Sequence, residues 1–282
     1  ASDYAQSWLQ KIPKNVVGEI HLAGFTPVTE GELAIDDHSQ PISDIGWQLY
    51  QFSLQRFGAI PTLIEWDNNL PSWQELLAEA ACQRVLDAAQ KAIAANGAFK
   101  LVLAGGTAPV KAYQLLATKQ ADWSKWHIYY GDERCLPVDD SERNSLVAEQ
   151  KWLDLVAIPK AQIHRIAAEL GAEAGAEQYA KVVAEAGGFD LVLLGMGEDG
   201  HTASLFPGHV HNVDELTHAV HNSPKPPSDR VTISAKALSN TAELIFIVSG
   251  DKQDALEAWK NKQDIPVTQL CPESGVDVLL CV

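Results

Sequence analysis

The segment at residues 189–208, FDLVLLGMGEDGHTASLFPG, limits the possible folds more than any other part of the chain. It opens with the apolar run Phe189–Leu194, whose length and composition predict a buried strand. A glycine-rich stretch follows at once, and His201 ends it, where we expect a short helix to begin. A buried strand that leads into a glycine-rich turn is typical of parallel α/β sheets, which form binding sites at their carboxyl edge. Histidine is the side chain best suited to move a proton near neutral pH, so this turn is a candidate site.

Strand and helix patterns alternate along most of the chain. Strands are expected at residues 61–66, 99–104, 126–130, 189–194, 243–248 and 276–282. Helices are expected at residues 72–96, 109–117, 144–155 and 172–186, and again from residue 251. This alternation predicts an α/β fold with a mainly parallel sheet and helices on both faces. Residues 1–59 lack clear periodicity and are expected to form a separate N-terminal segment, followed by an α/β domain at residues 60–282.

The net charge of −16 at pH 7 limits the partners that this chain can bind. Nucleic acids and anionic membranes need a positive protein surface, so neither is an expected partner. A small anionic substrate is compatible with this charge, because a few Arg and Lys side chains or a helix N-terminus can bind phosphate. The sequence has no secretory signal, no apolar run of the roughly 18 residues that span a bilayer, and no C-x-x-C pair. We therefore expect a cytoplasmic protein without an obligate protein partner.

A glycine loop follows the expected strand at residues 99–104. Gly105, Gly106 and Thr107 come directly before an expected helix, near Pro109. Glycines let a backbone approach a ligand closely, and a helix N-terminus offers unpaired N–H groups and the positive end of a dipole. The loop is either a tight strand-to-helix turn or a binding loop for phosphate or sugar.

Charged side chains follow two other expected strands. Asp132 and Arg134 come after the strand at 126–130, and Lys252 comes after the strand at 243–248. Arg134 is suited to bind phosphate with two parallel hydrogen bonds, although a surface salt-bridge cluster has the same composition. Because carboxyl ends of parallel strands share one sheet edge, we expect these side chains to converge there.

The segment PKPPSDRVTIS at residues 224–234 has a proline-rich loop before an expected strand, and it supplies two further cations, Lys225 and Arg230. The Pro-Pro pair stiffens this loop and would hold the two cations in place around an anion. The alternative is that both are ordinary solvated charges.

Taken together, these segments resemble the 6-phosphogluconolactonase family, and the resemblance covers about residues 60–282. The matching segments are GGTAP (105–109), GDERCLP (131–137), GMGEDGHTASLFPG (195–208), KPPSDRVT (225–232) and VSGDK (248–252). Glucosamine-6-phosphate deaminases and related isomerases have a similar fold and a similar turn, but the continuation TASLFPG resembles the lactonases. Ala108 departs from the family, many of whose members have a second hydroxyl side chain at this position.

The resemblance implies hydrolysis of 6-phospho-D-glucono-1,5-lactone to 6-phosphogluconate in the oxidative pentose phosphate pathway, without a metal or another cofactor. It implies that His201 is the general acid/base and that Asp132 holds the imidazole or a substrate hydroxyl. The other residues expected to bind the substrate are Gly105, Gly106, Thr107, Arg134, Gly197, Asp199, Gly200, Lys225, Arg230 and Lys252. Two alternatives are an amino-sugar phosphate isomerase/deaminase and a non-catalytic sugar-phosphate sensor.

Residues 1–78 resemble another family, the C-terminal end of a multinuclear-iron barrel related to the oxygenase subunit of methanobactin biosynthesis. The metal ligands of that family would map onto Asp36, His38, Glu65 and His21. Only about two barrel strands are present, and a metal site needs its full ligand set, so we expect no competent metal site. An iron-dependent enzyme is the alternative. The strand at 61–66 and the helix from residue 72 are also expected to serve as the first strand and helix of the lactonase domain.

Overall fold

The structure, a computed structural model, describes residues 2–28, 37–68 and 71–281. The chain divides into two compact units, Ala1–Ser72 and Trp73–Val282, which we call unit 1 and unit 2. This division lies later in the chain than the boundary expected between residues 59 and 60. Each unit is described by itself.

Unit 1 consists of short elements. They are α1 (Ser2–Leu9), β1 (Ile20–Ala23), α2 (Asp44–Phe57) and β2 (Thr62–Glu65). Strand β2 pairs with β1 in a parallel two-stranded sheet. The expectation that this strand belongs to the lactonase sheet is therefore wrong. A central parallel strand is buried on both faces, whereas Leu63 and Ile64 of β2 are 46% and 43% exposed.

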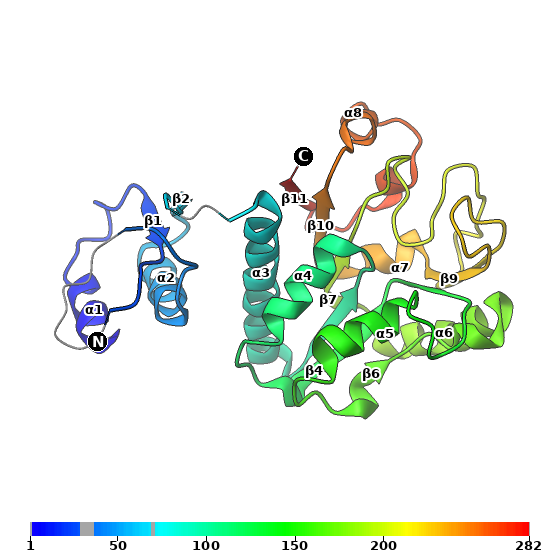
Figure 1. Cartoon of the computed structure of the whole chain (residues 1–282), viewed down its shortest axis with the longest axis horizontal. Coiled ribbons are helices and arrows are strands. Elements are labelled where there is room, and N and C mark those ends of the chain that lie inside the picture. Colours follow the sequence, from blue (N-terminus) through cyan, green and yellow to red (C-terminus); the bar gives the residue numbers. More distant parts are fainter. Residues whose placement is uncertain (1, 29–36, 69–70, 282) are drawn as a thin grey trace. The chain divides into compact units, whose positions relative to one another are not determined.

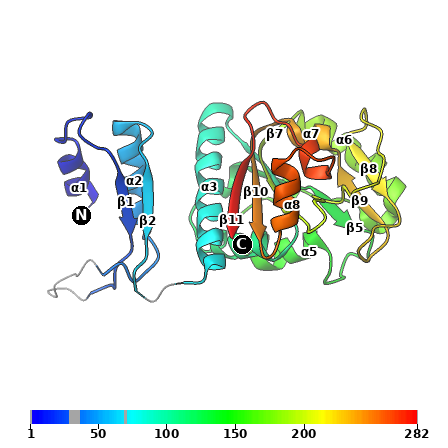
Figure 2. The ribbon, with the colours of Figure 1, turned by 90° about the horizontal axis from the view of Figure 1, so that it is seen from above.

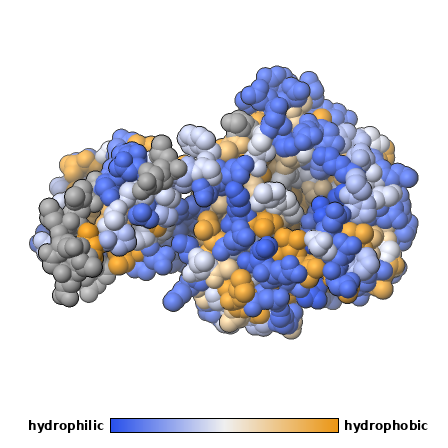
Figure 3. All heavy atoms as spheres, viewed as in Figure 1, coloured by the Kyte–Doolittle hydropathy of each residue, from blue (hydrophilic) through white to orange (hydrophobic). Residues whose placement is uncertain are grey.

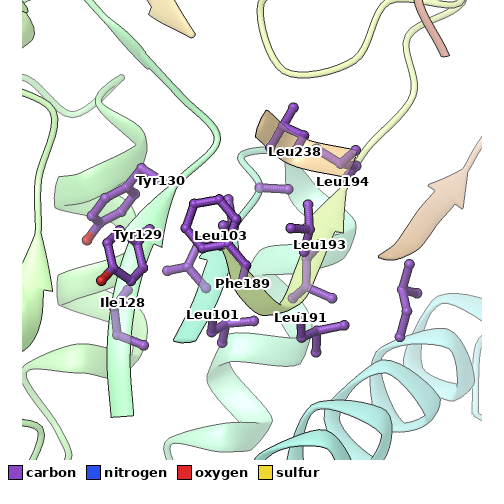
Figure 4. Close-up of a cluster of buried hydrophobic side chains, with 14 of the residues drawn as sticks. Leu101, Leu103, Ile128, Tyr129, Tyr130, Phe189, Leu191, Leu193, Leu194 and Leu238 are labelled. Atoms are coloured by element: carbon purple, nitrogen blue, oxygen red, sulfur yellow. The ribbon is translucent and has the colours of Figure 1, made fainter. Parts of the chain in front are cut away.

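The main sheet of unit 2 is parallel throughout and has the strand order β11-β10-β7-β3-β4-β6. Its strands are β3 (Phe99–Leu103), β4 (Trp126–Tyr130), β6 (Ile163–His164), β7 (Phe189–Leu194), β10 (Thr241–Ser249) and β11 (Asp277–Cys281). The central strands are nearly continuous apolar runs, as burial on both faces requires. Figure 4 shows the side chains of β3, β4 and β7 meeting in the core, with Leu101 and Leu191 completely buried.

The helices of unit 2 are α3 (Trp73–Asn96), α4 (Thr107–Leu116), α5 (Asn144–Ala148), α6 (Ala172–Ala186), α7 (Ala235–Ser239) and α8 (Gln253–Lys260). Figures 1 and 2 show the long α3 along the sheet, where it contacts β3, β7, β10 and β11. Helix α8 lies on the other side of β10 (Figure 2), where Trp259 packs edge-on against Phe246. The predicted α/β fold, with a mainly parallel sheet and helices on both faces, is confirmed.

A second, antiparallel sheet has the order β5-β9-β8 and was not predicted from the sequence. Its strands are β5 (Asp132–Arg134), β8 (Thr217–Val220) and β9 (Arg230–Ile233). Gly131 joins the two sheets, because its N–H donates to the Leu103 carbonyl at 2.9 Å and its carbonyl accepts from the Ile233 N–H at 2.8 Å. The β8–β9 loop, which carries Lys225, is therefore brought to the carboxyl edge of the parallel sheet.

Hydrophilic residues cover much of the face drawn in Figure 3, with hydrophobic residues in smaller groups between them. In the part of the chain that the structure describes, every helix is too short or too polar to cross a bilayer.

Candidate active site

The glycine loop between β3 and α4 is shaped by two different constraints. Gly106 has a φ of +102°, in the region that favours glycine. A Cβ on Gly105 would lie 2.3 Å from Oδ1 of Asn144, so a larger residue would clash with that side chain. Helix α4 begins at Thr107 without a side-chain N-cap hydrogen bond. Its first N–H groups are thus left for a ligand, at the positive end of the helix dipole.

The turn after β7 places His201 beside Asp199. The imidazole Nδ1 lies 2.5 Å from Oδ1 of Asp199, and the backbone N–H of His201 donates to the same oxygen at 3.2 Å. Burial raises the pKa of Asp199, but the hydrogen bonds and the charge interaction with His201, together with a backbone hydrogen bond of Asp199 itself, give a net downward shift. A carboxylate on Nδ1 fixes the orientation of the ring and favours the tautomer whose Nε2 accepts a proton.

No short helix begins at His201. Instead, Thr202 and Leu205 form an isolated antiparallel bridge, and the Thr202 hydroxyl donates to the Gly195 carbonyl at 2.8 Å. Ala203 has a φ of +48°, which does not fit a right-handed helix, and Pro207 disfavours helical backbone at Phe206.

Asp132 lies on β5 and is only 6% exposed. Its Oδ2 accepts from the Ser204 hydroxyl at 2.6 Å, and its Oδ1 accepts from the Asn144 amide at 3.1 Å. The carboxylate that holds His201 is thus Asp199, and Asp132 instead connects α5 to the turn that follows β7.

The cations around the site are held in different ways. Arg230 is 5% exposed and donates through Nη2 to the carbonyls of Lys225 and Pro226, at 3.0 and 2.9 Å. Burial lowers the pKa of Arg230. Arg134 donates to the Glu142 carbonyl, and the Lys225 ammonium is recorded with no hydrogen-bond partner among the described residues. Arg230 therefore shapes the β8–β9 loop, and Lys225 is left for a ligand.

Phe206 connects the histidine to this cationic group. Its ring is 4.8 Å from the His201 ring between centroids, and the Arg230 guanidinium carbon lies 5.6 Å from its centroid. Phe206 is 2% exposed and fully packed, so it restricts the movement of both neighbours.

A cavity of about 260 Å³ unites these groups at the carboxyl edge of the parallel sheet. Of the residues singled out in the sequence, those that line it are Gly105, Gly106, Thr107, Asp132, Arg134, Gly197, His201, Lys225, Arg230 and Lys252. The two that do not line it are Asp199, which holds His201, and Gly200. Gly200 has a φ of +75°, and a Cβ there would lie 2.8 Å from Ile265, so its role in this structure is to form the turn.

Sequence reasoning missed two polar residues of this site, Asn144 and Ser204. Both bind Asp132, and Asn144 also lines the cavity. Each lies within a segment already singled out, but neither has a spacing that indicates its partner. Their role depends on Asp132 being buried between two sheets, which the sequence does not indicate.

Three of the four positions onto which the iron ligands of the other family would map, His21, His38 and Glu65, lie in the described part of unit 1. Asp36 lies outside the described residues. The Nδ1 atom of His21 contacts Glu65 at 2.7 Å. That of His38 contacts Asp67 at 2.9 Å and lies 3.6 Å from Glu65. Within the described ranges, no three His, Cys, Asp or Glu side chains are arranged to hold an ion.

The close approach at Gly197 gives a testable prediction. A Cβ at this position would lie 2.0 Å from Nδ1 of His201 and 2.8 Å from Oδ1 of Asp199. We expect Gly197→Ala to displace the imidazole and to lower kcat/KM for the reaction of this site by about 100-fold. The matched control is Gly195→Ala, whose Cβ would make only an ordinary 3.9 Å contact with the Gly105 carbonyl. Equal losses in the two variants would contradict this explanation.

Comparison with known proteins agrees with this geometry. Residues 72–279 match the family model described as glucosamine-6-phosphate isomerases/6-phosphogluconolactonase. The chain belongs to this family. The match to the family model begins at Ser72, the last residue of unit 1, and it covers all the elements that form the cavity. Residues 2–88 also match the model of the RiPP precursor modification enzymes MbnB/TglH/ChrH.

Curated members of the family are similar over most of their length. The chain is 40% identical over 202 residues to a 6-phosphogluconolactonase of Mycobacterium tuberculosis, covering 65% of this chain and 81% of that protein. It is 38% identical over 196 residues to that of Mycobacterium leprae, covering 64% and 79%. The crystal structure of 6-phosphogluconolactonase from Thermotoga maritima superposes with a TM-score of 0.68 at 26% identity, covering 72% of this chain and 94% of that one.

Proposed function

We infer that this protein is a 6-phosphogluconolactonase, which hydrolyses 6-phospho-D-glucono-1,5-lactone to 6-phosphogluconate in the oxidative pentose phosphate pathway. The observation that carries the inference is one cavity that holds a histidine–aspartate pair, a glycine loop at a helix N-terminus and a group of cations. Its family membership and its identity to curated lactonases support the same reaction.

His201 is the general base of the proposed mechanism. With Nδ1 held by Asp199, Nε2 accepts a proton from water while the water oxygen bonds to C1 of the lactone. The bond between C1 and the ring oxygen then breaks, and the imidazolium returns the proton to that oxygen. The products are the carboxylic acid and the free hydroxyl, so the atoms of lactone and water are all accounted for. A lactone carbonyl is reactive enough that these steps need neither a cofactor nor a covalent intermediate.

The glycine loop and the cations bind the rest of the substrate. The N–H groups near Gly105, Gly106 and Thr107 stabilise either the phosphate or the oxyanion that develops at C1. Lys225, Lys252 and Arg134 supply positive charge to the phosphate, and Arg230 positions the loop that carries Lys225. Asp132 is a positioning residue, since Ser204 and Asn144 occupy its two oxygens.

The proposal is tested with lactone generated in situ, whose hydrolysis is followed through 6-phosphogluconate dehydrogenase against the spontaneous rate. We expect clear acceleration by the full chain. A folded protein that does not accelerate the reaction would overturn the proposal, and release of ammonia from glucosamine 6-phosphate would favour the deaminase instead.

Lys225→Met gives a second prediction for this site. It removes an ammonium that makes no hydrogen bond to any described residue, so we expect KM for the lactone to rise on the order of tenfold, with a much smaller change in kcat. Lys236→Met is the matched control, because Lys236 lies on α7 and only faces Asp214 at 3.8 Å. Steady-state kinetics measure both, and an unchanged KM in Lys225→Met would exclude Lys225 from phosphate binding.

The expected partners and the expected cellular location are part of this proposal. The partner is a small sugar-phosphate lactone, without nucleic acid, membrane or obligate protein partner. The cytoplasmic location stays a prediction, since the similar rice proteins are named chloroplastic.

A further inference from the structure

Glu198 contacts one of the cations of the cavity from outside. Its Oε1 lies 3.2 Å from the ammonium of Lys252, and Glu198 itself is not among the residues that line the cavity. The two partners differ in exposure, because the Lys252 side chain is 16% exposed and that of Glu198 is 73% exposed. The lysine is thus a fixed part of the cavity wall, whereas the carboxylate is a surface group that can leave.

A second cation also acts on this carboxylate. The hydrogen bond from Lys252 is the main cause of a lowered pKa of Glu198, and the charges of Lys252 and then Lys225 lower it further. The negative charge of Glu198 therefore interacts with both lysines. Arg134 and Arg230 donate hydrogen bonds to uncharged backbone carbonyls, and the nearest carboxylate oxygen printed for Arg230 is Oδ2 of the buried Asp132, 4.0 Å from its Nη1.

We propose that the carboxylate of Glu198 is an internal competitor for the anionic group of the ligand. In the free protein this carboxylate forms an ion pair with the ammonium of Lys252, and a bound phosphate replaces it there. This inference rests on the proposed function, in which Lys225 and Lys252 bind the phosphate of the lactone. Glu198 is then a specificity-determining residue and not a catalytic one.

The competition depends on charge. A phosphate monoester carries a charge of about −1.5 to −2 at neutral pH, whereas the carboxylate carries −1. A doubly charged group gains more from the two lysines than Glu198 does, and it displaces the carboxylate. A monoanion gains no such advantage, and a neutral lactone leaves the Lys252–Glu198 pair intact. Glu198 therefore makes the cavity select phosphorylated ligands over singly charged and neutral ones.

The test is Glu198→Gln, which removes the charge and keeps the size of the side chain. With inorganic phosphate as the probe, calorimetric titration of the full chain is expected to show a Kd lowered about threefold, the size typical of one exposed ion pair. The preference for phosphate over acetate is expected to fall, because acetate no longer competes with a resident carboxylate. Glu177→Gln is the matched control, since Glu177 is exposed on α6 and pairs only with Lys181.

A double-mutant cycle then assigns the effect to Lys252. In a Lys252→Met background, Glu198→Gln is expected to tighten phosphate binding much less, because only the weaker interaction of Glu198 with Lys225 is then removed. A phosphate Kd that is unchanged or raised in Glu198→Gln would overturn the proposal. The same holds if Glu177→Gln lowers the Kd equally, or if Glu198→Gln lowers it as much in the Lys252→Met background as in the wild type. Phosphate titration needs no turnover. If the wild-type protein hydrolyses the lactone but has the same phosphate Kd as Glu198→Gln, this inference alone is refuted. If the wild-type protein has no lactonase activity, the proposed function is refuted.

Discussion

Replacing His201 by alanine is expected to lower kcat for lactone hydrolysis by about 10²- to 10⁴-fold, the range typical of losing a positioned general base. The imidazole lines the cavity with its Nδ1 held by Asp199, whereas the Asp132 carboxylate in the same cavity already accepts from Ser204 and Asn144. The KM is expected to change much less, because the cations and the glycine loop are untouched. The measurement is the coupled assay, with the spontaneous rate subtracted.

Two further variants make this result specific. Asp199→Asn keeps the size of the side chain but removes the carboxylate that fixes the tautomer, so it is expected to cause a large loss of kcat as well. His127→Ala is the control, because His127 lies near the start of β4, away from the carboxyl edge, and stacks on His164. Wild-type kcat in a folded His201→Ala protein would exclude His201 as the base.

Arg143→Ala is expected to destabilise unit 2 by about 3–5 kcal/mol, the cost typical of removing one partner from a buried ion pair. Glu133 is completely buried, and Nε of Arg143 lies 3.5 Å from its carboxylate. The same guanidinium donates to the carbonyls of Leu136 and Ile166, at 3.1 and 2.8 Å. Alanine would leave a buried negative charge and two buried carbonyls without this partner.

Urea unfolding of the full chain measures this effect. The control is Lys181→Ala, which breaks only the exposed pair with Glu177 and is expected to cost less than about 0.5 kcal/mol. Because Glu133 also accepts from the backbone N–H groups of Asn144 and Ser145, we expect activity to fall along with stability in Arg143→Ala. A cost below about 1 kcal/mol would show that these backbone donors stabilise the buried carboxylate without the arginine.

Much of unit 2 can be predicted from the sequence, because its signals are local. The strand at Phe189–Leu194 was expected with the bounds that the structure has, and so was the helix at Ala172–Ala186. Both are long and strongly patterned, and glycines follow both. The convergence of the glycine loop, Asp132 and His201 follows from one property of parallel sheets, whose carboxyl ends share an edge.

The sequence could not separate the tasks of the two aspartates. Asp199 precedes His201 by two residues, and Asp132 follows a strand, so each is a reasonable partner for the imidazole. The difference arises from the β5–β9 pairing, which buries Asp132 opposite Thr232. Strands of three and four residues carry too little periodicity to be recognised, so neither this sheet nor its effect on Asp132 was predictable.

The strand at Thr62–Glu65 was recognised, but its partner was not. An apolar run indicates a strand without indicating which sheet it joins, since pairing between distant segments leaves no local pattern. The structure pairs it with β1, in a register that places Ile20 beside Thr62, 42 residues later in the chain. For the same reason the sequence boundary between 59 and 60 and the structural division after Ser72 differ.

The two sheets contribute different functional groups to the cavity. The proton-transfer pair lies on the turn after β7 of the parallel sheet, and Lys225 lies on the β8–β9 loop of the antiparallel sheet. Changes in the length or charge of that loop would alter which anion is accepted without altering the bond that is cleaved. An engineer seeking new lactone substrates would therefore randomise residues 221–229 together with Glu198, and would leave Asp199 and His201 unchanged.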